Sequence, residues 1–199
     1  AQTYNDTTVT LGGTLLVDTA GAGVSIPNSV VLNAGGGIIT LTDSDVNNDI
    51  TLGAVSGAQA LNVTAGGGDI TIASTDGTPT SITSTSATFT TTGSVMVAAG
   101  AAVSITTDQI SVGNSLGNSG AGAITLQPTT DGVTIGLNDG SGTFNLTATE
   151  LGYLTTSGIV TIGRTTGTGT ISLGGSGATD LSATTYNLTI EGTSSPVSF

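Results

Sequence analysis

Pairs of aliphatic residues separated by a single residue recur from one end of the chain to the other. Thr, Ser, Asp or Gly flank each pair, and the pairs follow one another at short, fairly even intervals. They include Val9/Leu11, Val24/Ile26, Ile39/Leu41, Ile50/Leu52, Leu61/Val63, Ile70/Ile72, Val103/Ile105, Ile124/Leu126, Val160/Ile162 and Ile171/Leu173. Alternation with a period of two is typical of strands that bury one face. The pattern therefore predicts an all-β protein.

Turn-forming residues separate these pairs. Gly-Gly-Gly occurs at 35–37 and 66–68, and Asp-Gly occurs at 76–77, 131–132 and 139–140, as expected between strands. No segment has the apolar spacing of a long helix, and only TATELGYL (147–154) predicts a single helical turn.

Short strands at regular spacing occur in sandwiches, barrels and solenoids. The inward positions are nearly all Val, Ile or Leu, which suits stacked aliphatic columns, and the outward positions are mostly Thr, Ser, Asn and Gly. The pattern continues without a break in composition, so residues 1–199 are expected to form one continuous β-repeat domain. A parallel β-solenoid with roughly 20–30 residues per coil fits best, and a β-sandwich is the alternative.

The composition excludes several classes of chemistry. Cys and His are absent, and Arg164 is the only basic residue, which removes thiolate and imidazole chemistry and lysine nucleophiles. A net charge of −12 disfavours nucleic acid and anionic membranes as partners. Asp43 and Asp45 offer a carboxylate pair for sugar cleavage, but the chain has few residues to hold an anionic sugar. We expect no enzyme, no catalytic residue and no organic cofactor.

Three stretches resemble the repeats of large bacterial secreted exoproteins of the filamentous-haemagglutinin type. They are TATELGYLTTSGIVTIGRTTGTGTISLGG (147–175), DSDVNNDITLGAVSGAQALNVTAGGGDITIAS (43–74) and DLSATTYNLTIEG (180–192). The resemblance implies a right-handed parallel β-helix that serves as a shaft or an adhesive surface, secreted and displayed outside the cell. The Asn-Pro-Asn motifs of the secretion domain in such proteins are absent, which implies shaft rather than export module. Within the resemblance, Arg164 ends a strand and points to solvent or to a carboxylate of a neighbouring coil.

The densest group of oxygen ligands is DSDVNND (43–49). Its alternate positions resemble the start of a calcium loop: Asp43, Asp45, Asn47 and Asp49. Asn48 occupies the place of the glycine in an EF-hand, and Ala54 occupies that of the bidentate glutamate. The segment is therefore predicted either to bind calcium or to form a polar turn.

Thr-x-Thr pairs recur at 8/10, 40/42, 88/90/92, 147/149 and 166/168/170. Stacked on one flat face, such pairs would order water as in ice-binding solenoids, but their irregular spacing favours ordinary outward positions of strands.

The expected partner of the chain is a second copy of itself. TYNDTTVTLGG near the start and PVSF at the end are apolar enough to complement the open strand edges of a neighbour. The sequence thus predicts a structural subunit or shaft of an extracellular filament, joined head to tail. The alternative is an adhesin that binds glycans or host and biofilm partners. Sugar sites usually stack aromatic rings, and only Tyr4, Tyr153 and Tyr186 are candidates here.

Overall fold

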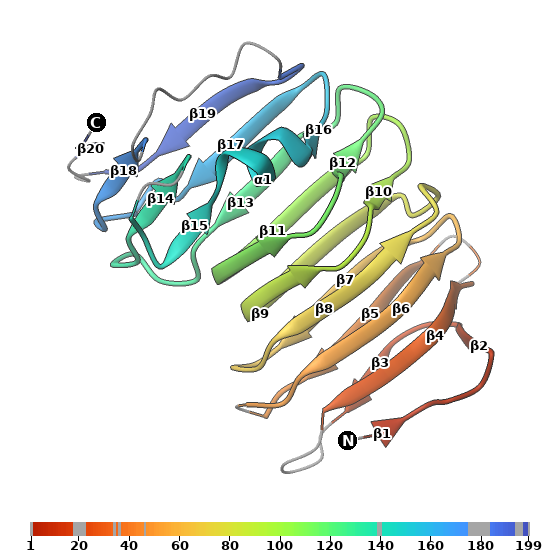
Figure 1. Cartoon of the computed structure of the whole chain (residues 1–199). Coiled ribbons are helices and arrows are strands. Elements are labelled where there is room, and N and C mark those ends of the chain that lie inside the picture. The colour runs from red at the N-terminus through yellow and green to blue at the C-terminus, as the bar shows by residue number, and fades with distance from the viewer. Residues whose placement is uncertain are drawn as a thin grey trace.

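Parallel strands stack side by side along one axis, and the two termini lie at opposite ends of the stack (Figure 1). The computed structural model describes residues 2–17, 23–33, 35, 37–45, 47–138, 141–174, 184–193 and 197–198. Every strand pairing in the described residues is parallel. This confirms the predicted parallel β-solenoid and excludes the sandwich, whose sheets are built from antiparallel strands.

Three faces surround the core. Face 1 contains β3 (Leu15–Val17), β5 (Ile38–Asp43), β7 (Ala60–Ala65), the first halves of β9 (Ser81–Thr91) and β11 (Ala102–Val112), β13 (Ile124–Gln127), β17 (Ile159–Gly163) and β19 (Asn187–Glu191). Face 2 contains β1 (Gln2–Thr3), the first parts of β4 (Val24–Leu32), β6 (Ile50–Ser56) and β8 (Ile70–Thr75), and the second halves of β9 and β11. It continues with β15 (Phe144–Leu146), β14 (Ile135–Leu137), β18 (Ile171–Leu173) and β20 (Val197–Ser198). Face 3 contains β2 (Thr8–Leu11), the second parts of β4, β6 and β8, then β10 (Val95–Val97), β12 (Leu116–Asn118) and β16 (Leu154–Thr155).

Columns of aliphatic side chains fill the interior. On face 1, Leu61, Ile82, Val103 and Ile124 pair in succession, each 21 residues after the last. All four are fully buried, and each such side chain contributes about 1.5–3 kcal/mol through the apolar surface it removes from water. The alternating pairs of the sequence therefore identified Leu61, Val103 and Ile124 but missed Ile82, and the expected coil of roughly 20–30 residues covers the observed step of 21.

The corner between faces 1 and 2 brings polar groups inside, which the aliphatic pattern did not predict. β9 and β11 run through this corner without a break, and their inward alternation shifts phase there. Ser86 and Thr107 both turn inward and are buried. The Thr107 hydroxyl donates to the carbonyl of Ala87 at 2.9 Å or to that of Gln109 at 2.8 Å. These bonds satisfy carbonyl groups at the bend, so the corner is held by hydroxyl groups rather than by packing alone.

An irregular segment interrupts the regular coils after β13. The chain first forms β14 and then turns back to form β15, which pairs with β14 and lies between it and β11. The helix α1 (Ala148–Tyr153) follows, as the sequence predicted for 147–154. Thr147 and Glu150 form a reciprocal capping box at its start, which satisfies two backbone N–H groups. The Asp-Gly turn predicted at 139–140 lies outside the described residues.

Candidate functional site

The acidic turn after β5 is built around a buried carboxylate. Asp43 points into the solenoid and is completely buried. Its Oδ1 accepts hydrogen bonds from the backbone N–H of Asp45 at 3.1 Å and from the amide of Asn48 at 3.2 Å. Among the described residues its Oδ2 has no hydrogen-bond partner. The amide of Asn48 also lies 3.4 Å from Asp45 Oδ2, so one amide group lies between the two carboxylates.

The other two predicted calcium ligands do not join this group. Asn47 is exposed and has a φ of 72°, a left-handed conformation that asparagine tolerates in turns. Asp49 is exposed, and its Oδ1 accepts the backbone N–H of Asp69 in the next coil at 3.0 Å. In the part of the chain that the structure describes, no three His, Cys, Asp or Glu side chains are close enough to share a metal ion. Calcium binding stays a prediction, which a melting-temperature titration with millimolar calcium tests.

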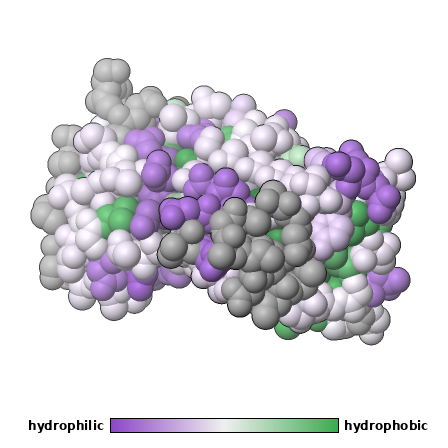
Figure 2. Space-filling model, turned by 90° about the horizontal axis from the view of Figure 1, so that it is seen from below, coloured by the Kyte–Doolittle hydropathy of each residue, from purple (hydrophilic) through white to green (hydrophobic). Residues whose placement is uncertain are grey.

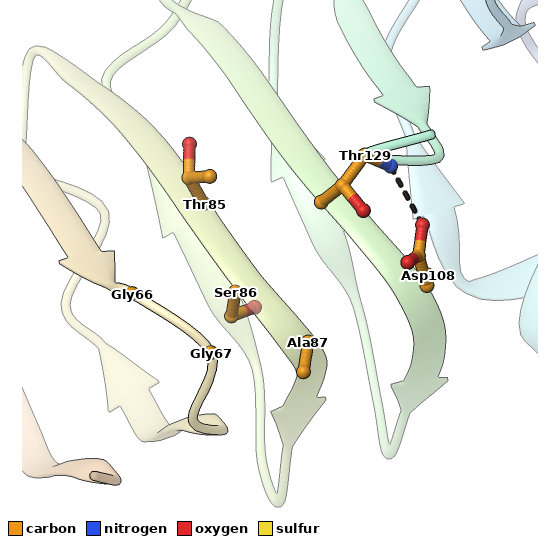
Figure 3. Close-up of a pocket in the computed structure, with 7 residues that line it drawn as sticks. All are labelled: Gly66, Gly67, Thr85, Ser86, Ala87, Asp108 and Thr129. Carbon is orange, nitrogen blue, oxygen red and sulfur yellow. Dashed lines mark hydrogen bonds between the residues drawn. The ribbon is translucent and has the colours of Figure 1, made fainter. Parts of the chain in front are cut away.

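A surface groove lies beside this turn, at the corner between faces 1 and 2 (Figure 3). It has a volume of about 320 Å³ and is lined by Gly66, Gly67, Thr85, Ser86, Ala87, Asp108 and Thr129. Asp108 Oδ1 accepts the backbone N–H of Thr129 at 2.8 Å, which fixes one wall (Figure 3). The groove therefore offers hydroxyl groups, glycine backbone and one carboxylate, and none of the lining residues is aromatic.

The single basic residue is a clamp between coils. Arg164 follows β17, and its Nη1 donates to the carbonyl of Pro128 at 3.0 Å and to that of Thr129. Its Nε lies 3.1 Å from Asp131 Oδ1. The same carboxylate oxygen accepts the hydroxyl of Thr166 at 2.7 Å. Of the two directions expected for Arg164, solvent or a carboxylate of a neighbouring coil, the structure shows the second. The sequence did not indicate that Asp131 is this carboxylate, because the contacts of Arg164 lie about 35 residues away in the chain.

The tyrosines do not form a platform for sugar rings. Tyr186 is buried, and its hydroxyl donates to the carbonyl of Leu151 in α1 at 2.9 Å. Burial raises the pKa of the Tyr186 hydroxyl above its usual value of 10.0. Tyr4 and Tyr153 are half-buried and pack against the core. Tyr153 and Tyr186 therefore both lie at α1, whereas Tyr4 lies near the other end of the stack, and all three side chains pack against the core.

The Thr-x-Thr pairs of the sequence do not share one surface. Thr40 and Thr42 lie on the outside of face 1 in β5, whereas Thr90 lies on the outside of face 2. The pair at 147/149 belongs to the start of α1. The side chains that do stack on Thr40 and Thr42 come from other coils, and only the strand register identifies them.

The surface seen in Figure 2 is largely intermediate in hydropathy, with separate hydrophilic clusters, as expected for a coat of Thr, Ser and Gly with few charges. In the described part of the chain no helix is long and apolar enough to span a membrane. No protein-family model, no curated protein and no solved structure matches this chain. The resemblance to filamentous-haemagglutinin-type exoproteins therefore stays a prediction.

Proposed function

We propose that this chain is a structural segment of an extracellular filament, a shaft that lengthens by adding strands at its two ends. The observation that carries the proposal is the continuity of the interior columns. Leu41 of β5 belongs to the same column as Ile190 of β19, through Val63, Ser84, Ile105, Leu126 and Ile162. β3 pairs with β5 beyond this column, and a second copy placed end to end continues face 1 by pairing its β3 with β19.

The strands at the two ends provide the pairing groups for such an addition. In the described part of the sheets, β1, β2 and β3 at one end and β19 and β20 at the other each pair on one side only. Unpaired N–H and C=O groups along an edge strand template the addition of another strand. Because all pairings are parallel, the free edges of the two ends are complementary in direction.

Charge favours growth in length over bundling. The net charge is −12, so the sides of neighbouring rods repel each other, and salt weakens this repulsion. The backbone pairing at the ends depends much less on charge. We therefore expect long single fibres at low salt and bundles at higher salt.

Electron microscopy of the purified chain in moderate salt tests the proposal. We expect unbranched fibres with a repeat of about 4.8 Å along the axis. Ile190→Lys places a charge in the end column, facing the incoming strand, and should leave dispersed rods. Thr189→Lys is the matched control because its side chain points outward from the same strand, and it should still form fibres. Dispersed rods from the unmodified chain would contradict end-to-end assembly.

The groove beside Asp108 supports a second candidate, an adhesive surface that binds glycans. Its hydroxyl groups and carboxylate suit hydrogen bonding to a neutral sugar. A glycan-binding screen of the unmodified chain and of Asp108→Ala separates the two functions. Glycan binding that Asp108→Ala abolishes would favour the adhesin. A screen in which no glycan binds the unmodified chain would favour the filament.

A further inference from the structure

The outer surface of face 1 carries two parallel rows of short polar side chains. One row contains Thr40, Asn62, Thr83, Ser104, Thr125, Thr161 and Thr189, which pair in this order from strand to strand. The second row contains Thr42, Thr64, Thr85, Thr106 and Gln127. We propose that this surface, the threonine face, binds ice.

Backbone pairing fixes the spacing of these rows. Neighbouring strands lie about 4.8 Å apart, and alternate residues of one strand lie about 6.6 Å apart. The hydroxyl groups therefore form a two-dimensional lattice rather than a scattered set, and oxygen atoms on the surfaces of hexagonal ice repeat at similar distances. Threonine is β-branched, so its side chain has little rotamer freedom to lose on binding. The surface is thus ordered before it meets a ligand.

Most hydroxyl groups of the two rows are available, although within the second row the hydroxyl of Thr106 accepts the side-chain amide of Gln127 at 3.1 Å. Thr40, Thr83, Thr85 and Thr125 make no side-chain hydrogen bond within the described part of the protein. Other threonines use their hydroxyl groups internally, such as Thr107, which bonds to the corner carbonyls, and Thr156, which bonds to the carbonyl of Gly122 at 2.6 Å. A row of oriented but unused donors and acceptors is suited to a ligand that is itself a hydrogen-bonded lattice.

The chemistry around the rows favours ice over a sugar or an ion. The outward residues of β5, β7, β9 and β11 on this face are uncharged, although the chain carries thirteen acids. No aromatic side chain lies among them to stack on a sugar ring. Ile38 and Ile159 are the only large hydrophobic residues that are exposed among those described, at 57% and 50%, and both lie outward on face 1 strands. On these four strands the surface is therefore a mixture of methyl, hydroxyl and amide groups without charge, and the carboxylates of Asp108 and Glu191 lie at its borders.

Face 2 supplies an internal comparison. Thr51, Thr71 and Thr90 pair in a single outward row there. The neighbouring outward positions hold the exposed carboxylates of Asp49 and Asp69. Ionised groups keep their own hydration shells, so this face does not present the same neutral lattice. A substitution on face 2 is therefore a matched control for one on face 1.

The experiment measures thermal hysteresis and ice-crystal shape with the full chain. We expect the unmodified protein to shape ice crystals and to produce hysteresis. Thr85→Lys places a long charged side chain in the middle of the threonine face and should remove most of the hysteresis. Thr90→Lys makes the same change in the same strand but on face 2, and should leave the hysteresis unchanged. Circular dichroism and melting temperature establish that both variants are folded.

Several outcomes overturn the proposal. One is the absence of hysteresis and of ice shaping with the unmodified chain. Another is an equal loss in the folded variants Thr85→Lys and Thr90→Lys, because the effect would then not belong to face 1. Binding to crystalline cellulose or chitin without any effect on ice would assign the surface to a carbohydrate. If two copies associate through the threonine face, Thr85→Lys abolishes that association and ice is unaffected, the surface would be assigned to self-association.

Discussion

The regular coils and the irregular segment after them are held together in different ways. Between β7 and β13 each coil repeats the last after 21 residues, and apolar columns and backbone pairing hold the rungs in place. Between β13 and β17 the corresponding step is 36 residues, from Ile124 to Val160. This longer coil contains the helix α1 with Glu150, and Arg164, which follows β17, reaches back to its turn at 128–131.

The difference shows what a break in the repeat requires. Where the spacing is regular, each strand finds its neighbour through identical backbone pairing, and few specific side chains are needed. Where the chain makes an excursion, the next strand has to return to the same register, and long polar side chains reach back across it. Arg164 contacts the turn at 128–131 from one side, and Asp108 holds Thr129 from the other. The single guanidinium is therefore placed where the repeat is interrupted, whereas carboxylates such as Asp49 also link the regular coils.

The largest expected effect lies in the regular coils. Phe89 is fully buried in the column of face 2, and Phe89→Ala should lower the free energy of unfolding by about 3–5 kcal/mol through the cavity that it leaves. Urea denaturation measures this loss. Thr90→Ala, the adjacent outward residue, is the control and should change stability by about 0.5 kcal/mol or less. Similar effects of the two substitutions would mean that the column does not carry the regular coils.

The next effect concerns the helix of the irregular segment. Glu150 accepts the backbone N–H of Thr147 at 2.9 Å within its capping box and that of Val112 in β11 at 2.9 Å. Glu150→Ala removes both acceptors and should cost about 1–3 kcal/mol, because Val112 is buried and its N–H loses its partner. Urea denaturation again measures the change. Glu191→Ala, which removes an equal charge in the last coil, is the control and should cost little, because loss of one carboxylate from a chain of net charge −12 does not increase its self-repulsion. An equal loss in both variants would mean that the two bonds accepted by Glu150 are not the cause.

A smaller effect is expected at the single arginine. The ion pair of Arg164 with Asp131 is partly exposed, so it contributes about 0–1 kcal/mol and weakens as salt rises. Arg164→Lys keeps the charge but loses the planar fork that reaches both the carbonyls and the carboxylate. Because these contacts need the planar fork, the variants Arg164→Lys and Arg164→Ala should have nearly the same melting temperature. A melting temperature of Arg164→Lys equal to that of the unmodified chain would reduce the clamp to a charge effect.

The smallest effect appears only at alkaline pH. The pKa of Tyr186 is raised in the folded protein by burial, so above pH 10 the unfolded state loses the phenolic proton first. Stability that is fully present below about pH 10 therefore declines as the pH rises toward the folded-state pKa. Tyr186→Phe should flatten this decline, at the cost of about 1 kcal/mol at neutral pH for the lost hydrogen bond to Leu151. An identical alkaline decline in the variant would contradict the assignment.

The sequence was sufficient for the strands but not for their partners. Alternation identified buried residues such as Leu61 and Val103, and local sequence identified the helical turn at 147–154, because both depend on neighbours in the chain. The polar corner at Ser86 and Thr107 and the order of β14 and β15 were not predictable, because they depend on how coils stack. The threonine face was hidden for the same reason. Thr64, Thr85 and Thr106 lie 21 residues apart, so no local motif contains them.

The reversed order of β14 and β15 has a consequence for a chain that folds from its N-terminus. β14 appears first, but its place in the stack is next to β15, which comes later in the sequence. At that moment the exposed rung is β11, and the strand that belongs beside it has not yet arrived. For such a route we expect growth on face 2 to pause after β13 until residues 144–153 are present. β15 and α1 then complete the rung beside β11, which makes this position a checkpoint in an otherwise continuous winding process.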